Sequence, residues 1–444
     1  MKRDKSFVYG VATAAYQIEG AISEDGRVPS VWDTYCTMPG RIYNGDSGDI
    51  ACDHYHRYKE DIALMAELGV NSYRFSIAWS RIYSAKGVYN ENGMRFYRDI
   101  LAELKKYNIA PSVTLYHFDL PQWAQDLGGW ENRECAEWYN EYARKCFDEL
   151  GADVPMWITH NEPWCASFLS YMEGTLAPGY TNMEKALKAA HHQLLSHGMA
   201  IKSFREMGLP GQIGITLNPA PIYAESGSFR DDIARTAQDG YRNRWFFDPL
   251  FGKGYPRDIA MLFAARCGTS FDFIQVGDSD VISTPIDFLG LNFYSHTVVR
   301  YRSSCYLLNE DGHTDLPKTD MGWDICPETL VDLIQRIRLD YTDIPIYITE
   351  NGCALKDCVE DGAIHDSERA DYILRHLETI RNINRKGLNI KGYYCWTLMD
   401  NFEWACGYGK RFGLVYVDYE TQQRIPKDSF YAYKGYIEKN PDIC

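Results

Sequence analysis

Two glutamates in distant parts of the chain have the residue type and the setting for acid–base chemistry on a sugar. Glu162 lies in Thr-His-Asn-Glu-Pro (159–163), and Glu350 lies in Ile-Thr-Glu-Asn-Gly (348–352). Hydrolysis of a glycosidic bond uses two carboxyl groups on opposite sides of the anomeric carbon, one protonated and one ionised. A single glutamate of this kind is more often a salt-bridge or capping partner, whereas two, each beside an asparagine and a turn residue, favour a catalytic pair.

Each glutamate follows a short apolar run that is typical of a buried strand, and such runs alternate with helical patterns along the chain. The expected strands are residues 7–12, 72–77, 110–116, 156–160, 213–217, 286–292, 344–349 and 392–397. Amphipathic helices are expected at residues 58–68, 96–104, 134–150, 185–207, 330–339 and 369–385. This alternation predicts an α/β fold, a single-domain (β/α)8 TIM barrel over residues 1–444. A doubly wound sheet is disfavoured because the chain has no GxGxxG loop.

In such a barrel the chemistry lies at the carboxyl ends of the strands. The polar or aromatic residues at or near the expected strand ends are Gln17, Arg74, His117, Asn161, Glu162, Asn292, Glu350 and Trp396. The fifth strand end is the one where no such residue is expected. Strands four and seven lie across the barrel mouth from one another, so Glu162 and Glu350 are expected to face each other over a bound sugar.

Composition and charge narrow the class of protein. The chain has 45% hydrophobic residues, enough for a large core, and a net charge of −15, which disfavours nucleic acid and anionic membranes as partners. We expect a cytoplasmic protein, because the N-terminus has no continuous apolar run and no stretch approaches the ~20 apolar residues of a membrane span. Thirteen cysteines without a CxxC pair favour free thiols, and the histidine spacing favours no metal. Homo-oligomerisation is left open.

Seven motifs, taken in order, resemble those of glycoside hydrolase family 1. They are ATAAYQIEG (12–20), YRFSIAW (73–79), LYHFDLP (115–121), THNEP (159–163), LGLNFY (289–294), ITENG (348–352) and WTLMDNFEW (396–404). Each string alone is moderately specific, whereas the ordered set is very specific and extends from Phe7 nearly to the C-terminus. The resemblance implies a (β/α)8 barrel that hydrolyses β-glycosides with retention of configuration and without a cofactor.

The resemblance also implies roles for individual residues. Glu162 corresponds to the acid/base and Glu350 to the nucleophile, while Asn161 corresponds to the residue that binds the sugar 2-hydroxyl. Arg74 and Tyr294 resemble the pair that contacts the nucleophile, and such neighbours are expected to lower the pKa of Glu350. The other implied sugar-binding residues are Gln17, His117, Trp323 on the aglycone side, Trp396 beneath the ring, Glu403, Trp404 and Phe412, with Asn292 in a supporting position.

The expected substrates are small soluble β-glucosides, such as the cellobiose released by cellulose degradation. Glu403 and Trp404 are intact, which favours plain glucosides because a 6-phosphate dianion would be repelled by the Glu403 carboxylate. The alternatives are a 6-phospho-β-glucosidase, a broad β-galactosidase or β-fucosidase, and a transglycosylase that uses the same covalent intermediate. A catalytically dead sugar-binding protein and a thioglucosidase are disfavoured because both glutamates are present.

Overall fold

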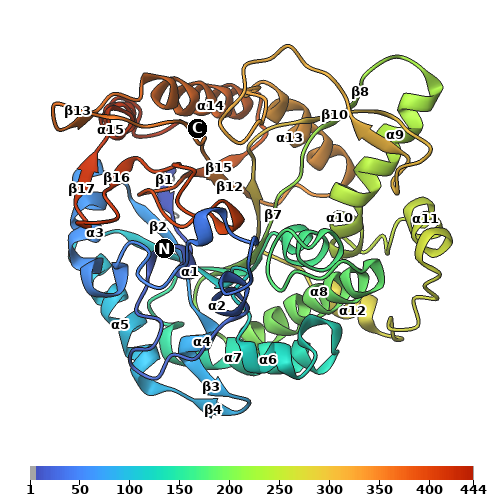
Figure 1. Cartoon of the computed structure of the whole chain (residues 1–444), viewed down its shortest axis with the longest axis horizontal. Helices are drawn as coiled ribbons and strands as arrows, with labels where there is room; N and C mark the ends of the chain where they lie inside the picture. The colour runs from blue at the N-terminus through green and yellow to red at the C-terminus, as the bar shows by residue number, and fades with distance from the viewer. Residues whose placement is uncertain (1–6, 444) are drawn as a thin grey trace.

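A computed structural model describes residues 7–443 of the chain, and at its centre lies a closed barrel of eight parallel strands (Figure 1). The barrel strands are β1 (Val8–Ala12), β2 (Ser72–Ser76), β5 (Ala110–Tyr116), β6 (Met156–Asn161), β7 (Gln212–Leu217), β9 (Phe288–Asn292), β12 (Ile346–Asn351) and β15 (Ile390–Trp396). They neighbour one another in sequence order, and β15 pairs with β1 to close the ring. The predicted TIM barrel is confirmed, and every predicted strand overlaps a barrel strand.

Helices from the segments between the strands surround the barrel (Figure 1). The long ones are α3 (His54–Leu68), α5 (Glu91–Lys106), α7 (Glu134–Leu150), α8 (Met183–Glu206), α13 (Thr329–Asp340), α14 (Ser367–Arg385) and α15 (Asp428–Lys439). Six of these overlap predicted helices, and the bounds of α7 are those predicted from its apolar spacing. The helix α3 ends at Gly69, whose φ of +85° is the left-handed conformation that glycine adopts without strain.

The connection between β7 and β9 differs from the sequence-based expectation, which had no helix there. It contains α9 (Phe229–Asp239), the π-helical turn η4 (Gly240–Arg244), α10 (Trp245–Leu250), α11 (Arg257–Cys267) and α12 (Asp278–Ile282). Pro249 and Pro256 divide this segment into pieces. The pieces η4, α10 and α12 have at most six residues and are too short to show a helical period.

Successive side chains along a barrel strand point alternately into the barrel interior and toward the surrounding helices. In β6, Ile158 packs in one cluster with Met156 and Phe288, whereas Trp157 contacts Phe147 of α7 with ring centroids 5.1 Å apart. All six residues of β6 are buried. A strand with both faces covered consists almost entirely of apolar residues, and this pattern predicted β6 from the sequence.

Shorter elements decorate the barrel. The short helices are α1 (Ala15–Ile18), α2 (Val31–Cys36), α4 (Trp79–Ile82), α6 (Gln122–Asp126), η1 (Tyr43–Gly45), η2 (Gly129–Glu131), η3 (Cys165–Glu173) and η5 (Trp404–Cys406). The short strands are β3 (Tyr83–Ala85), β4 (Val88–Tyr89), β8 (Ile222–Ala224), β10 (Thr297–Tyr301), β11 (Asn309–Asp311), β13 (Val359–Glu360), β14 (Ala363–Ile364), β16 (Val415–Val417) and β17 (Arg424–Pro426).

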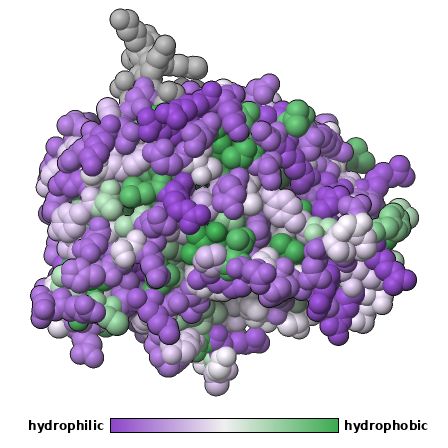
Figure 2. All heavy atoms as spheres, turned by 90° about the horizontal axis from the view of Figure 1, so that it is seen from above, coloured by the Kyte–Doolittle hydropathy of each residue, from purple (hydrophilic) through white to green (hydrophobic). Residues whose placement is uncertain are grey.

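The surface is mainly hydrophilic. Figure 2 shows one face on which purple side chains dominate and apolar side chains form small separate groups. Within residues 7–443, no helix is long and apolar enough to cross a membrane. The cysteines in the same range are free, and most of them are buried.

Candidate active site

A cavity of about 420 Å³ lies where the carboxyl ends of the barrel strands meet. Segments that follow β5, β6, β7, β9 and β15 contribute to its wall, and β12 contributes Glu350. Of the residues predicted from the sequence, those that line it are His117, Asn161, Glu162, Asn292, Tyr294, Trp323, Glu350, Trp396, Glu403, Trp404 and Phe412. Gln17 and Arg74 are buried directly behind this wall, in contact with residues that line it.

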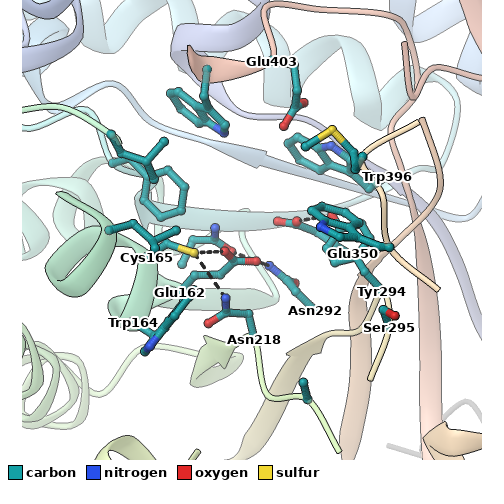
Figure 3. A pocket seen from close by; sticks show the side chains of 18 of the residues that line it. Glu162, Trp164, Cys165, Asn218, Asn292, Tyr294, Ser295, Glu350, Trp396 and Glu403 are labelled. Carbon is teal, nitrogen blue, oxygen red and sulfur yellow. Dashed lines mark hydrogen bonds between the residues drawn. The ribbon is translucent and has the colours of Figure 1, made fainter. Parts of the chain in front are cut away.

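Glu162 and Glu350 lie on opposite sides of this cavity with their carboxyl groups turned toward it (Figure 3). Glu162 directly follows β6, and Glu350 lies near the end of β12. Both strands have a register irregularity close to these positions. Such irregularities re-aim side chains at strand ends, so two strands that are otherwise regular can turn one carboxyl group each toward the same space.

Two donors hold the carboxylate of Glu350. Arg74 Nη1 donates to Oε1 at 2.5 Å, and the hydroxyl of Tyr294 donates to Oε2 at 2.7 Å. Arg74 is itself buried on β2, where Nη1 also donates to Thr349 O and Nη2 donates to Asn161 Oδ1. The predicted contact of Arg74 and Tyr294 with Glu350 is therefore present.

The amide of Asn161 is oriented by its neighbours. Its Oδ1 accepts from Arg74 Nη2 at 2.7 Å and from Asn292 Nδ2 at 3.0 Å, so the Nδ2 group is directed the other way. One N–H of that group donates to His117 Nε2 at 3.1 Å. Burial and the charge of Arg74 keep the pKa of His117 well below its usual value, so its ring is neutral and Nε2 can accept this bond.

Burial dominates the protonation of the carboxyl groups in the cavity. It raises the pKa of Glu350 to about 7, against the lowering effects of Arg74 and Tyr294. It also raises the pKa of Glu403 to about 8, where the charge of Glu350 acts in the same direction. Arg74 and Tyr294 lower the pKa of Glu350 as expected, but burial outweighs them and the net shift is upward. One guanidinium and one phenol do not replace the hydration that a fully buried carboxylate loses.

The far end of the cavity is built from the first motif and the last. Gln17 Nε2 donates to Phe402 O at 2.8 Å, to Asn401 Oδ1 at 3.0 Å and to Glu403 Oε2 at 3.4 Å. Gln17 lies in α1, just after β1, and the other three follow β15. Because β1 and β15 are paired, residues almost 400 positions apart are fixed against each other here.

Aromatic rings form the walls around these polar groups. His117 lies nearly parallel to both Trp396 and Trp404, with ring centroids 5.8 and 5.9 Å apart. On another side Trp323 packs against Tyr294 at 5.2 Å and Phe412 at 6.2 Å. Flat apolar rings beside carboxyl and amide groups suit the two kinds of surface that a sugar presents.

Several lining residues were not predicted. Trp164, Cys165, Asn218, Arg242 and His296 all contribute to the cavity wall. The first two directly follow the Thr-His-Asn-Glu-Pro motif, so their position beside it was a usable signal. Asn218 follows β7 and corrects the expectation that the fifth strand end offers nothing, because its amide donates to Cys165 Sγ there. Arg242 lies in η4 and His296 lies in the short connection from β9 to β10, and the sequence has no distinguishing pattern at either position.

Metal ligation is not indicated by the arrangement of side chains. Across residues 7–443, no group of three or more His, Cys, Asp or Glu side chains is placed to hold a metal ion. The carboxyl groups in the cavity are instead contacted by arginine, tyrosine, asparagine, glutamine and cysteine donors.

Comparison with known proteins gives one consistent result. The family model described as Glycosyl hydrolase family 1 matches residues 2–442. Beta-glucosidase A of Acetivibrio thermocellus is 44% identical, with 98% of each chain covered. A bifunctional beta-D-glucosidase/beta-D-fucosidase of Bifidobacterium breve is 42% identical, over 98% of this chain and 97% of its own. The crystal structure of a GH1 beta-glucosidase from Exiguobacterium antarcticum superimposes with a TM-score of 0.97 at 52% identity, with 99% of each chain covered.

These matches span nearly the whole chain, and they agree with a closed barrel whose two glutamates share one cavity. The chain therefore belongs to glycosyl hydrolase family 1 and is a retaining glycosidase of the β-glucosidase type.

Proposed function

We propose that this enzyme hydrolyses small β-glucosides by double displacement, with Glu350 as nucleophile and Glu162 as acid/base. The observation that carries the proposal is the position of the two carboxyl groups on opposite sides of one cavity (Figure 3). Ionised Glu350 attacks the anomeric carbon while Glu162 gives its proton to the departing oxygen, and a covalent glucosyl ester forms on Glu350. Once that ester exists, the negative charge of Glu350 is gone, and ionised Glu162 removes a proton from the attacking water.

Further support for these roles comes from the neighbours of each carboxyl group. Glu350 has a cation and a hydroxyl donor, which favour its ionised form and fix the direction of attack. Asn161 has one oriented N–H beyond its contact with His117, and we assign it to the sugar 2-hydroxyl, where a hydrogen bond strengthens in the transition state.

We assign the sugar hydroxyls to the opposite end of the cavity. Gln17 Oε1 and His117 Nδ1 are buried, and neither has a hydrogen-bond partner among residues 7–443. A buried polar atom without a partner costs free energy, and hydroxyl groups of a bound sugar supply partners. Glu403 and Trp404 complete this subsite, with Trp396 as the platform beneath the ring.

Azide rescue tests the assignment of the two glutamates. Glu350→Gly is expected to lose hydrolysis and to regain turnover with added azide, because the small anion attacks from the side that the carboxylate occupied. With an activated β-glucoside, azide displaces the leaving group with inversion, so the rescued product is α-glucosyl azide. Glu162→Gly with 2,4-dinitrophenyl β-glucoside and azide is expected to give β-glucosyl azide instead. A β product from Glu350→Gly would refute the assignment.

One relative is named as a bifunctional glucosidase/fucosidase, so the test of substrate preference includes sugars other than glucose. We propose unphosphorylated glucosides such as cellobiose as the preferred substrates, because Glu403 presents a carboxyl group and not a cation to a 6-phosphate dianion, which would lose its hydration in this buried subsite. The measurement is kcat/KM for p-nitrophenyl glucoside, galactoside, fucoside and 6-phosphoglucoside, and a higher value for the phosphorylated substrate would contradict the proposal. Product analysis at high cellobiose concentration separates hydrolysis from transglycosylation.

A further inference from the structure

A cysteine thiol contacts the carboxyl group of Glu162. Cys165 lies three residues after Glu162, at the start of η3, and its thiol donates to Oε2 at 2.9 Å. Behind it, Asn218 Nδ2 donates to the cysteine sulfur at 3.2 Å (Figure 3). Both residues are buried and line the cavity. The thiol therefore has a donor on one side and an acceptor on the other, which fixes its direction.

The thiol is one of two donors that hold the Glu162 side chain. Asn292 Nδ2 donates to the other oxygen, Oε1, at 2.6 Å. The backbone of Glu162 is fixed as well, since its N–H donates to Thr216 O at 2.9 Å and its carbonyl accepts from Ala166 N. With φ at +44°, Glu162 has a conformation that non-glycine residues seldom adopt, so these contacts must hold it in place.

We propose that Cys165, supported by Asn218, is a positioning residue that aims Oε2 of Glu162 and tunes how readily this carboxyl group releases its proton. The inference rests on the proposed role of Glu162 as acid/base. A thiol is a weak donor. It can fix the rotamer of the carboxyl group while stabilising the ionised form less than a hydroxyl or amide would, which suits a group that must be an acid in one step and a base in the next.

The thiol remains a donor at working pH. Burial, together with the nearby charge of Glu162, raises the pKa of Cys165 well above that of an ordinary cysteine. The other titratable or charged groups that face Glu162 are Glu350 on β12, Glu403 after β15, Arg74 on β2 acting through Asn161, His117 after β5, Tyr294 after β9 and Arg242 in η4. They are the same in every variant used below, so differences between variants report the group at position 165.

A comparison of leaving groups separates positioning from general damage. Phenyl β-glucoside needs proton donation to its poor leaving group, whereas 2,4-dinitrophenyl β-glucoside does not. Cys165→Ala is expected to lower kcat/KM for the phenyl substrate about five- to tenfold, the effect of one hydrogen bond, and to change that for the dinitrophenyl substrate less than about twofold. An equal fall for both substrates, or no fall for either, would overturn the proposal.

Cys135→Ala is the matched control, since Cys135 is fully buried in α7 and does not line the cavity. It should leave both rate constants unchanged. Asn218→Ala provides a second test if a Cys165 variant does not fold, because it removes the donor behind the thiol. We expect the same selective loss on the phenyl substrate, smaller in size, and an absence of that selectivity would count against the proposal.

The pH profile provides a readout that a purely structural role would not move. A donor to Oε2 stabilises the carboxylate, so its removal lets Glu162 hold its proton to higher pH. The basic limb of kcat/KM should move up in Cys165→Ala and down in Cys165→Ser, whose hydroxyl is a stronger donor, by about half a pH unit each. Cys165→Ser should also restore most of the activity on phenyl β-glucoside. If the limb stays in place in both variants, the tuning role is excluded.

Failure of this inference can be distinguished from failure of the proposed function. If Glu162→Gly with azide does not give β-glucosyl azide, the assignment of the acid/base is wrong, whatever the Cys165 variants do. If that product forms and the leaving-group selectivity of Cys165→Ala is absent, the acid/base assignment stands and the positioning role falls.

Discussion

At the scale of single residues, the site concentrates carboxyl groups in a space shielded from water. Glu162, Glu350 and Glu403 line the same cavity, and a direct contact with a guanidinium is made by Glu350 alone among the three. Burial raises the pKa of Glu350 and that of Glu403, so the empty site retains protons near neutral pH that exposed carboxyl groups would have lost. A bound sugar changes the protonation of these carboxyl groups, through its hydroxyl groups and through the ester that it forms with Glu350.

Tyr294→Phe tests how much one hydrogen-bond donor contributes to the pKa of Glu350. The hydroxyl of Tyr294 donates to Glu350 Oε2 and opposes the effect of burial. Its removal should raise the pKa of Glu350 further, so the acid limb of kcat/KM should move to higher pH by about half a unit to one unit. The measurement is kcat/KM for p-nitrophenyl β-glucoside between pH 5 and 9. An acid limb that moves to lower pH would contradict the account.

Glu403→Gln tests the cost of the buried charge. The pKa of Glu403 in the folded state lies above its unfolded value, so the folded protein binds the proton more tightly, and stability falls as pH rises from 4.5 to about 8. The glutamine of the variant does not ionise, so the variant does not lose stability in this way. Its thermal midpoint should exceed that of the unchanged enzyme by roughly 2–4 °C at pH 9 and match it near pH 5. Glu420→Gln, at an exposed position, is the control and should show no such pH dependence.

At the scale of elements, a buried ionic network joins the segment after β12 to the segment after β15, which forms part of the cavity wall. Lys427, at the start of α15, is fully buried and donates to Asp357 Oδ2 at 2.5 Å and to Asp400 Oδ1 at 2.7 Å. Arg369 of α14 pairs with Asp357, and Arg411 pairs with Asp400. The network thus connects the segment after β12, which carries Asp357, to the segment after β15, which carries Asp400.

Lys427→Met is expected to destabilise the protein and to disturb the sugar subsite. Removing one partner from a buried ion pair leaves carboxylates without full compensation, at a cost of roughly 3–5 kcal/mol. Asp400 lies three residues before Glu403, so KM for glucosides should rise as well. Urea unfolding and steady-state kinetics measure the two effects. Lys202→Met, at an exposed position on α8, should change neither, and an unchanged urea midpoint in the Lys427 variant would refute the role of the network.

Local patterns predicted the elements whose residues meet a uniform environment. The barrel strands are apolar because both of their faces are covered, and α7 has an unbroken apolar stripe. The same reasoning did not find α9 to α12, a segment that Pro249 and Pro256 interrupt and that has no long continuous helix. It also left the end of β7 without a role, because Asn218 acts through the sulfur of Cys165, and a sequence alone does not bring those two residues together. The raised pKa of Glu350 was missed because burial is a property of the folded site.

At the scale of the whole molecule, the net charge of −15 and the carboxyl groups of the cavity act in the same direction. A cationic ligand is therefore drawn toward the site, and salt weakens this attraction by screening it. The affinity for a neutral ligand should depend little on salt, because it has no net charge on which the field acts.

Ligand binding at two salt concentrations tests whether the negative charge of the protein attracts a cationic ligand to the cavity. The Kd of the basic sugar mimic 1-deoxynojirimycin at pH 7 should rise about three- to tenfold between 20 and 500 mM sodium chloride, whereas that of glucose should change less than about twofold. Calorimetry measures both. Equal salt dependence of the two ligands would show that the field of the molecule does not reach the cavity.

The pairing of β1 with β15 has a consequence for how the protein is made. Val8 lies opposite Gly392, so the first barrel strand is synthesised 384 residues before the residue with which it pairs. At roughly 5–20 residues per second this interval lasts roughly 20–80 s. Throughout it, the nascent chain presents an open strand edge to other chains in the cell. The barrel can therefore close only after the final strand has emerged from the ribosome.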